Sequence, residues 1–191
     1  MKFESHPTTV VCLMGKWVAA TGYSYAVYTF NNELRAVIDV NDGTNSDNVL
    51  LSKAWTPSLA TWYTVRASFY LSAGTGKLFI DGVDQSATVT DTTPNVSIPY
   101  AINNSTSPFM VGAFEAGPAY FLDGVIDAVV VAETYTATHS EPLNVTPGTD
   151  YLEDMKGLWN FNSSSYDDEI ESSDLTAPNG ATFVDGYPFQ L

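Results

Sequence analysis

Basic residues are scarce in this chain. Its 191 residues include 7 Lys and Arg against 22 Asp and Glu, which gives a net charge of −15. A uniformly acidic surface repels phosphate backbones and anionic lipid headgroups, so nucleic acid and membrane surfaces are disfavoured as partners. Solubility, including solubility in a salty medium that screens the repulsion, explains the acidic surplus, and calcium binding is the alternative.

Cysteine and long apolar runs are also nearly absent. The single Cys12 cannot form an internal disulfide, and it lies in the apolar run 10–14, where a buried and unreactive thiol is expected. No apolar run approaches the roughly 18 residues of a membrane span, and residues 1–5 lack the apolar core of a signal peptide. We therefore expect no membrane insertion. Export would use another route or occur inside an assembly, which places the protein at an extracellular or virion surface.

What the sequence does contain is typical of one large all-β domain. Hydrophobic residues make up 45% of the chain and aromatic residues 13%, enough apolar surface for a packed interior. Gly, Pro, Asn and β-branched residues interrupt every helical period. The predicted strands lie in residues 8–17, 23–30, 33–40, 49–51, 61–70, 77–83, 109–113 and 121–131.

The clearest strand signals lie in the segments 61–70, 77–83 and 121–131. Tyr63, Val65, Ala67 and Phe69 alternate with polar residues in the strand 61–70, which a Gly-containing turn joins to the strand 77–83 as a hairpin. The run 121–131 follows an Asp-Gly turn and is rich in Val and Ile, so it is predicted to be the central strand of a β-sandwich.

Later residues differ in character and suggest a division of the chain. We expect a β-sandwich in residues 1–141, a Pro- and Gly-containing linker in residues 142–157, and C-terminal strands in residues 158–191. Because about forty residues rarely bury a core alone, these strands are expected to complete the same sandwich or that of a neighbouring copy.

Five motifs in order resemble the laminin-G-like, concanavalin A-like jelly-roll family. They are Leu13-Met14-Gly15-Lys16-Trp17 with the strand 23–27, Trp62-Tyr63-Thr64-Val65, the hairpin 76–82 that ends in Asp-Gly, Phe109-Met110-Val111-Gly112, and the run 121–131. Residues 158–161 and 179–183 resemble the beginning of such a domain but come last here, so the chain resembles a circularly permuted or out-of-phase member. The resemblance implies an antiparallel β-sandwich of the jelly-roll type.

Carboxylates offer two candidate sites. Glu169, Glu171 and Asp174 resemble the paired carboxylates of jelly-roll glycosidases, but loop-like flanks favour an exposed acidic loop, and we predict no catalytic residue. Asp42, Asn45 and Asp47 supply the oxygen ligands that calcium requires, while turn formation explains the same cluster equally well. Members of the resembling family often carry calcium at a sheet rim, which makes calcium the one candidate cofactor.

Aromatic and histidine side chains give weaker signals. Phe114, Tyr120 and Tyr135 could stack on a sugar ring, although aromatics in sandwiches more often belong to the core. His6 and His139 lack the companions of a zinc site and are interpreted as solvated loop residues.

The predicted function is therefore non-enzymatic. The first hypothesis is a structural subunit, such as a virion decoration or appendage protein, that assembles with copies of itself or with another structural protein. The alternative is an adhesion module that binds a surface glycan, with or without calcium. A jelly-roll glycoside hydrolase is the remote third class.

Overall fold

The computed structural model describes residues 1–7, 9–18, 22–40, 47–92, 98–113, 120–126, 128–132 and 155–160. All regular structure in these ranges is β-strand, so the prediction of an all-β protein is confirmed for them. Within the same ranges, no helix offers the length and apolar character that a membrane crossing requires.

The larger of the sheets has six strands in the order β10-β2-β3-β4-β5-β9. Their bounds are β2 (Val11–Val18), β3 (Gly22–Phe30), β4 (Glu33–Asp39), β5 (Asn48–Ala54), β9 (Thr88–Asp91) and β10 (Met110–Val111). All five pairings are antiparallel. The predictions of strands at 23–30 and 33–40 are confirmed almost to the residue.

Two tight turns explain why neighbouring strands pair locally. Asn31 and Asn32 have φ of 49° and 60° between β3 and β4. Asp81 and Gly82 have φ of 49° and 76° at the end of β7 (Thr75–Ile80). Positive φ at both central residues matches the right-handed twist of a hairpin, and Asn, Asp and Gly tolerate it best.

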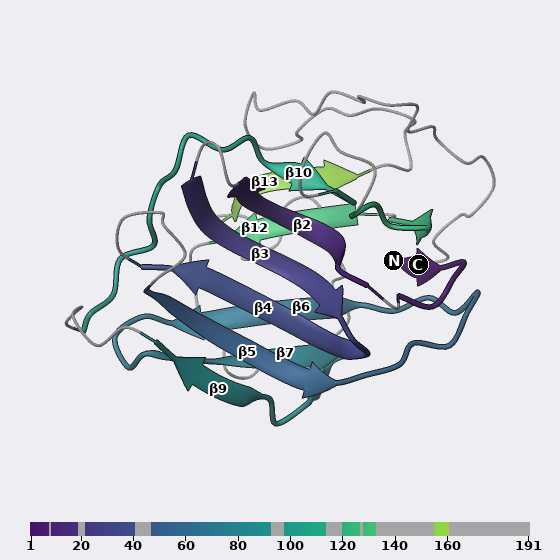
Figure 1. The fold of residues 1–191 in the computed structure, drawn as a ribbon, viewed down its shortest axis with the longest axis horizontal. Helices are drawn as coiled ribbons and strands as arrows, with labels where there is room; N and C mark the ends of the chain where they lie inside the picture. The colour runs from purple at the N-terminus through teal and green to yellow at the C-terminus, as the bar shows by residue number, and fades with distance from the viewer. Residues whose placement is uncertain are drawn as a thin grey trace.

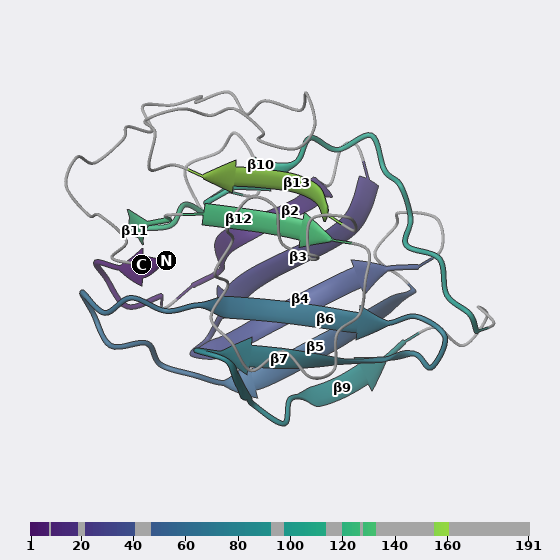
Figure 2. The ribbon, with the colours of Figure 1, turned by 180° about the vertical axis from the view of Figure 1, so that it is seen from behind.

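A second layer lies behind the six-stranded sheet (Figure 1) and is seen from its own side in Figure 2. It contains β6 (Val65–Tyr70), β7 and β8 (Val83–Asp84) as one sheet, and β12 (Ala128–Ala132) with β13 (Met155–Asn160) as another. A third pair joins β1 (Lys2–Phe3) to β11 (Gly124–Val125), and an isolated bridge links Lys2 to Trp62 just before β6. This two-layered, antiparallel arrangement is consistent with a β-sandwich.

The run 121–131 differs from its prediction. Instead of one central strand it contains two short ones, since β11 pairs with β1 and β12 pairs with β13. β3 and β4 are the strands that lie at the middle of the larger sheet, between β2 and β5. Alternation along a segment shows that it is extended, but only distant partners decide where it divides.

β13 supplies the one described part of the predicted C-terminal strands. It pairs antiparallel with β12 of the same chain, with Val130 opposite Leu158 and a register shift between Val131 and Ala132. The strand begins at Met155, inside the range expected to be linker. The rest of that linker and residues 161–191 lie outside the described residues.

The main core lies between the two layers. Its buried residues come from both, and they are Phe3, Leu13, Leu34, Ala36, Leu51, Leu78 and Ile80. The alternating side chains of the strand 61–70, Tyr63, Val65, Ala67 and Phe69, pack against this cluster, which confirms the predicted apolar face.

A smaller cluster lies on the other face of the six-stranded sheet. Cys12, Ala26 and Val37 are buried there, with Tyr28 and Leu50 packed around them. Ala26 lies directly opposite Val37, which in turn lies opposite Leu50. On this face the larger side chains of Tyr28 and Leu50 therefore pack around the smaller ones of Cys12, Ala26 and Val37.

Candidate functional site

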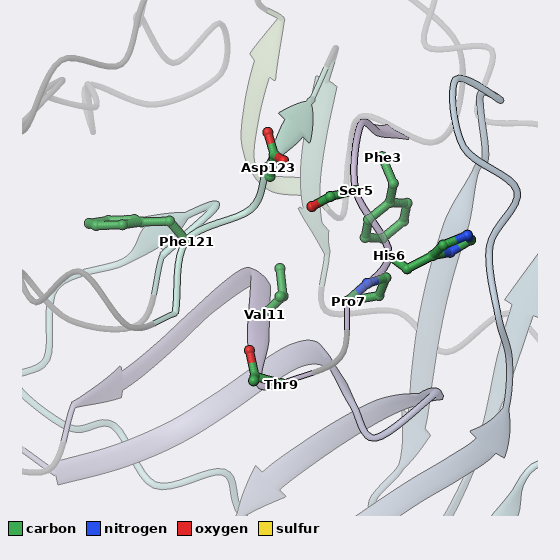
Figure 3. Close-up of a pocket in the computed structure, with 8 residues that line it drawn as sticks. All are labelled: Phe3, Ser5, His6, Pro7, Thr9, Val11, Phe121 and Asp123. Atoms are coloured by element: carbon green, nitrogen blue, oxygen red, sulfur yellow. The ribbon is translucent and has the colours of Figure 1, made fainter.

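A cavity of about 170 Å³ lies where the N-terminal segment meets the loop before β11 (Figure 3). Its polar lining consists of Ser5, His6, Thr9 and Asp123, and its apolar lining of Phe3, Pro7, Val11 and Phe121. A cavity that combines apolar walls with a few polar groups is the usual form of a small binding site.

Backbone contacts fix the two sides of this cavity. The Glu4 N–H donates to the Asp123 carbonyl at 2.9 Å, and the Cys12 N–H donates to the Tyr120 carbonyl at 3.2 Å. At Gly124 a Cβ atom would overlap the carbonyl oxygen of Lys2, so only glycine permits β1 and β11 to approach this closely. The Asp-Gly pair that the sequence presents as a turn thus also positions the cavity.

The charge of the lining is negative. Asp123 is its one carboxylate, and no Lys or Arg lines the cavity. The nearest lysine along the chain, Lys2, pairs with Glu4 at 2.7 Å and lies over the Trp62 ring at 5.9 Å. Within the described part of the chain, Asp123 forms no ion pair. The cavity is therefore suited to accept hydrogen bonds from a cationic or neutral group.

The predicted glycan-stacking residues are only partly described. Tyr120 is exposed over 37% of its surface, and the adjacent Phe121 over 40%. Phe114 and Tyr135 lie outside the described residues. The structure thus places one predicted aromatic next to the cavity.

The predicted calcium ligands are likewise mostly outside the description. Asp42 and Asn45 lie outside the described residues. Asp47 is buried, and its backbone carbonyl accepts a hydrogen bond from the Val40 N–H at 2.9 Å. Within the described ranges, no three His, Cys, Asp or Glu side chains form a group that could hold a metal ion. Calcium at residues 42–47 stays a prediction.

The other candidates divide between the cavity and the undescribed tail. His6, interpreted from the sequence as a solvated loop residue, is exposed and lines the cavity. His139 and the carboxylates Glu169, Glu171 and Asp174 lie outside the described residues.

A second polar group occurs on the face of the larger sheet that points away from the main core. Arg35 contacts Glu33 Oε2 through Nε at 2.8 Å and Nη2 at 2.6 Å, and its guanidinium lies 4.6 Å from the centre of the Phe30 ring. It also donates to the Tyr28 hydroxyl, whose pKa is raised chiefly by burial. Because Arg35 is engaged by three neighbours, this group is structural.

Cys12 confirms the expectation of a buried thiol, with none of its surface exposed. Burial raises the pKa of the Cys12 thiol above its ordinary value. The unfolded chain ionises this group above about pH 8.5 whereas the folded chain keeps its proton, so the unfolded state binds fewer protons there. The contribution of the protonated Cys12 thiol to folding stability is therefore complete below the pKa of the thiol in the unfolded chain. It is lost as the pH rises above that pKa.

We expect the free energy of unfolding to fall above about pH 8.5, by up to about 1.4 kcal/mol per pH unit from this one group. Urea denaturation between pH 7.5 and 9.5 measures the slope. Cys12→Ala is the control, since it removes the titrating thiol. An unchanged slope in that variant would assign the pH dependence to other groups.

Sequence reasoning missed most of the cavity. The sequence predicts that Thr9 and Phe121 lie in strands and that Asp123 lies in a turn, and Ser5 carries no functional signal. No local pattern could have identified them, because residues about 115 positions apart meet only through long-range contacts such as the β1–β11 pairing and the Cys12–Tyr120 hydrogen bond.

Comparisons with family models, with curated proteins and with solved structures found no match. A function is therefore proposed from the residues of this chain and their geometry.

Proposed function

We propose that this protein is a non-enzymatic structural subunit with a jelly-roll sandwich. It assembles with copies of itself, as a virion decoration or appendage subunit at an extracellular or virion surface does. The observation that carries the proposal is the edge strand β9.

β9 carries only some of the features that protect sheet edges, namely its length of four residues and the carboxylate of Asp91. All four of its residues, Thr88 to Asp91, are exposed, and three of them are β-branched. The strand contains no Lys, Arg or Pro, the residues that most often block edge-to-edge pairing. Within the described part of the chain, β9 pairs with β5 alone.

The register shows which backbone groups face outward. The Thr92 N–H donates to the Asn48 carbonyl at 3.0 Å. Hydrogen-bonded positions alternate along an antiparallel ladder, so the N–H groups of Thr90 and Thr88 point toward β5. The N–H and C=O of Val89 therefore point away from the sheet, where the strand of a second copy would pair with them.

Charge sets the conditions for this assembly. Two chains of net charge −15 repel one another, and salt screens that repulsion. Assembly through hydrogen bonds and apolar contacts at β9 should therefore strengthen as ionic strength rises, which is the opposite of assembly through ion pairs.

The test measures molar mass by light scattering after size exclusion, in low and high salt. We expect wild-type multimers whose fraction grows with salt, and a monomer for Val89→Lys, because Val89 is 37% exposed at the edge. Leu59→Lys, at a loop residue that is 41% exposed, is the charge-matched control and should assemble like the wild type. A monomeric wild type at every salt concentration, or unchanged assembly of Val89→Lys, contradicts the proposal.

A further inference from the structure

The register of β9 limits how two copies of the chain can meet. β9 forms one outer edge of the larger sheet (Figure 1). We propose that two copies pair antiparallel through β9 about a two-fold axis at Val89, so that Val89 of one copy lies opposite Val89 of the other. This inference rests on the proposed function and specifies the partner surface and its register.

The first argument is the direction of the backbone groups. Val89 lies opposite Leu51 at a position of the β5–β9 ladder without hydrogen bonds, so its N–H and C=O point away from β5. With a two-fold axis at this residue, each Val89 N–H donates to the Val89 C=O of the other copy. An axis between two residues would instead set outward-pointing groups against inward-pointing ones. A two-fold contact of this kind uses the same surface on both copies and closes on itself.

The second argument is the charge of Asp91. An axis at Asp91 would place the two carboxylates directly opposite each other, which is destabilising. An axis at Thr90 would leave them about 7 Å apart along the strands, within the Debye length of about 10 Å at 0.1 M salt. An axis at Val89 separates them by about 13 Å, beyond that length. For chains of net charge −15, the axis at Val89 therefore gives the weakest repulsion of the three.

The third argument is the pairing of side chains. Val89 lies on the same face as Leu51 of the main core, and 37% of its surface is exposed. Opposite its own copy, each valine covers apolar surface of the other. On the outer face, Thr88 then lies opposite Thr90 of the second copy, a favourable cross-strand pair. An axis at Thr88 would instead set Val89 against Ala87, which lies outside β9.

Disulfide trapping tests this register. Thr88→Cys and Thr90→Cys are prepared as separate proteins that differ in mass by a short tag, and each is oxidised alone and in an equal mixture at high salt. With the axis at Val89, position 88 of one copy faces position 90 of the other with Cα atoms about 4.5 Å apart, which suits a disulfide. Identical positions lie about 7–8 Å apart, which is too far. We expect at least about fivefold more cross-linked chains in the mixture than in either variant alone, measured by non-reducing electrophoresis and mass spectrometry.

Two controls make a missing cross-link informative. Both variants should fold, because Thr88 and Thr90 are exposed, and light scattering of the reduced proteins establishes that each still assembles. Cys12 is present in every sample but has none of its surface exposed, and the oxidised wild type measures any cross-link that it forms.

The outcomes separate this inference from the proposed function. Cross-linking of Thr90→Cys alone would overturn the inference, since it would place the axis at Thr90. No cross-link in any sample, from variants that still assemble, would also overturn it while leaving assembly at β9 standing. A monomeric wild type would contradict the proposed function, and the two-fold pairing would fail with it.

Discussion

Replacing Leu34 with alanine should lower the free energy of unfolding by about 3 kcal/mol. Leu34 has none of its surface exposed and lies on β4, in the cluster that joins the two layers. Truncation removes the transfer free energy of the lost methyl groups and leaves a cavity that a sheet held on both sides cannot close.

Urea denaturation of the wild type and variant measures this effect. Leu59→Ala is the matched control, because it makes the same chemical change at a loop residue that is 41% exposed. Its effect should stay within about 0.5 kcal/mol. Similar losses in both variants would contradict the assignment of Leu34 to the centre of the core.

Replacing Gly76 with valine should destabilise the protein by about 3 kcal/mol, although strand propensity alone predicts a gain. A Cβ at this position would overlap the carbonyl oxygen of Ser68 and lie 2.9 Å from Leu51 Cδ1. The first contact is to backbone of β6, and the second is to a buried side chain of the other layer. The Ser68 carbonyl cannot move without disturbing β6, and the Leu51 side chain can shift only within a packed core.

Thr75→Val is the control for Gly76→Val, since it introduces the same β-branched side chain one residue earlier on β7. Its effect on the midpoint of urea unfolding should be small in either direction. A stabilised Gly76→Val variant would show that β6 and β7 are not packed against β5 as the structure has them.

Local pattern was a sound guide to the hairpins. The pairs β3–β4 and β6–β7 were predictable because each strand alternates and a short Asn, Asp or Gly turn joins it to the next. The burial of Leu34, Ala36 and Ile38 on one face of β4 followed from the same alternation. In these segments each strand pairs with the next strand along the chain. The turn residues and the alternation of apolar and polar side chains are therefore enough to predict the pairing.

Prediction from the sequence was weakest where partners are far apart. β10 pairs with β2, with Met110 opposite Gly15, and β9 pairs with β5, with Val89 opposite Leu51. Neither partner is marked by a turn. Val37 and Asp39, on the opposite face of β4 from Leu34, are also buried, and side chains of neighbouring strands such as Tyr28 and Leu50 pack around Val37.

The sequence by itself determined that this chain is an acidic all-β protein with a buried thiol and no long apolar run, because composition and period 2 depend on no distant contact. The tertiary structure alone decided that residues 121–131 divide between two partners and that Ser5, Thr9 and Asp123 line one cavity. The physical reason is that the register depends on partners that no turn joins to this segment. β1 is over a hundred residues from β11, and β13 is 23 to 32 residues from its partners in β12, so no local pattern encodes the free energy of either pairing.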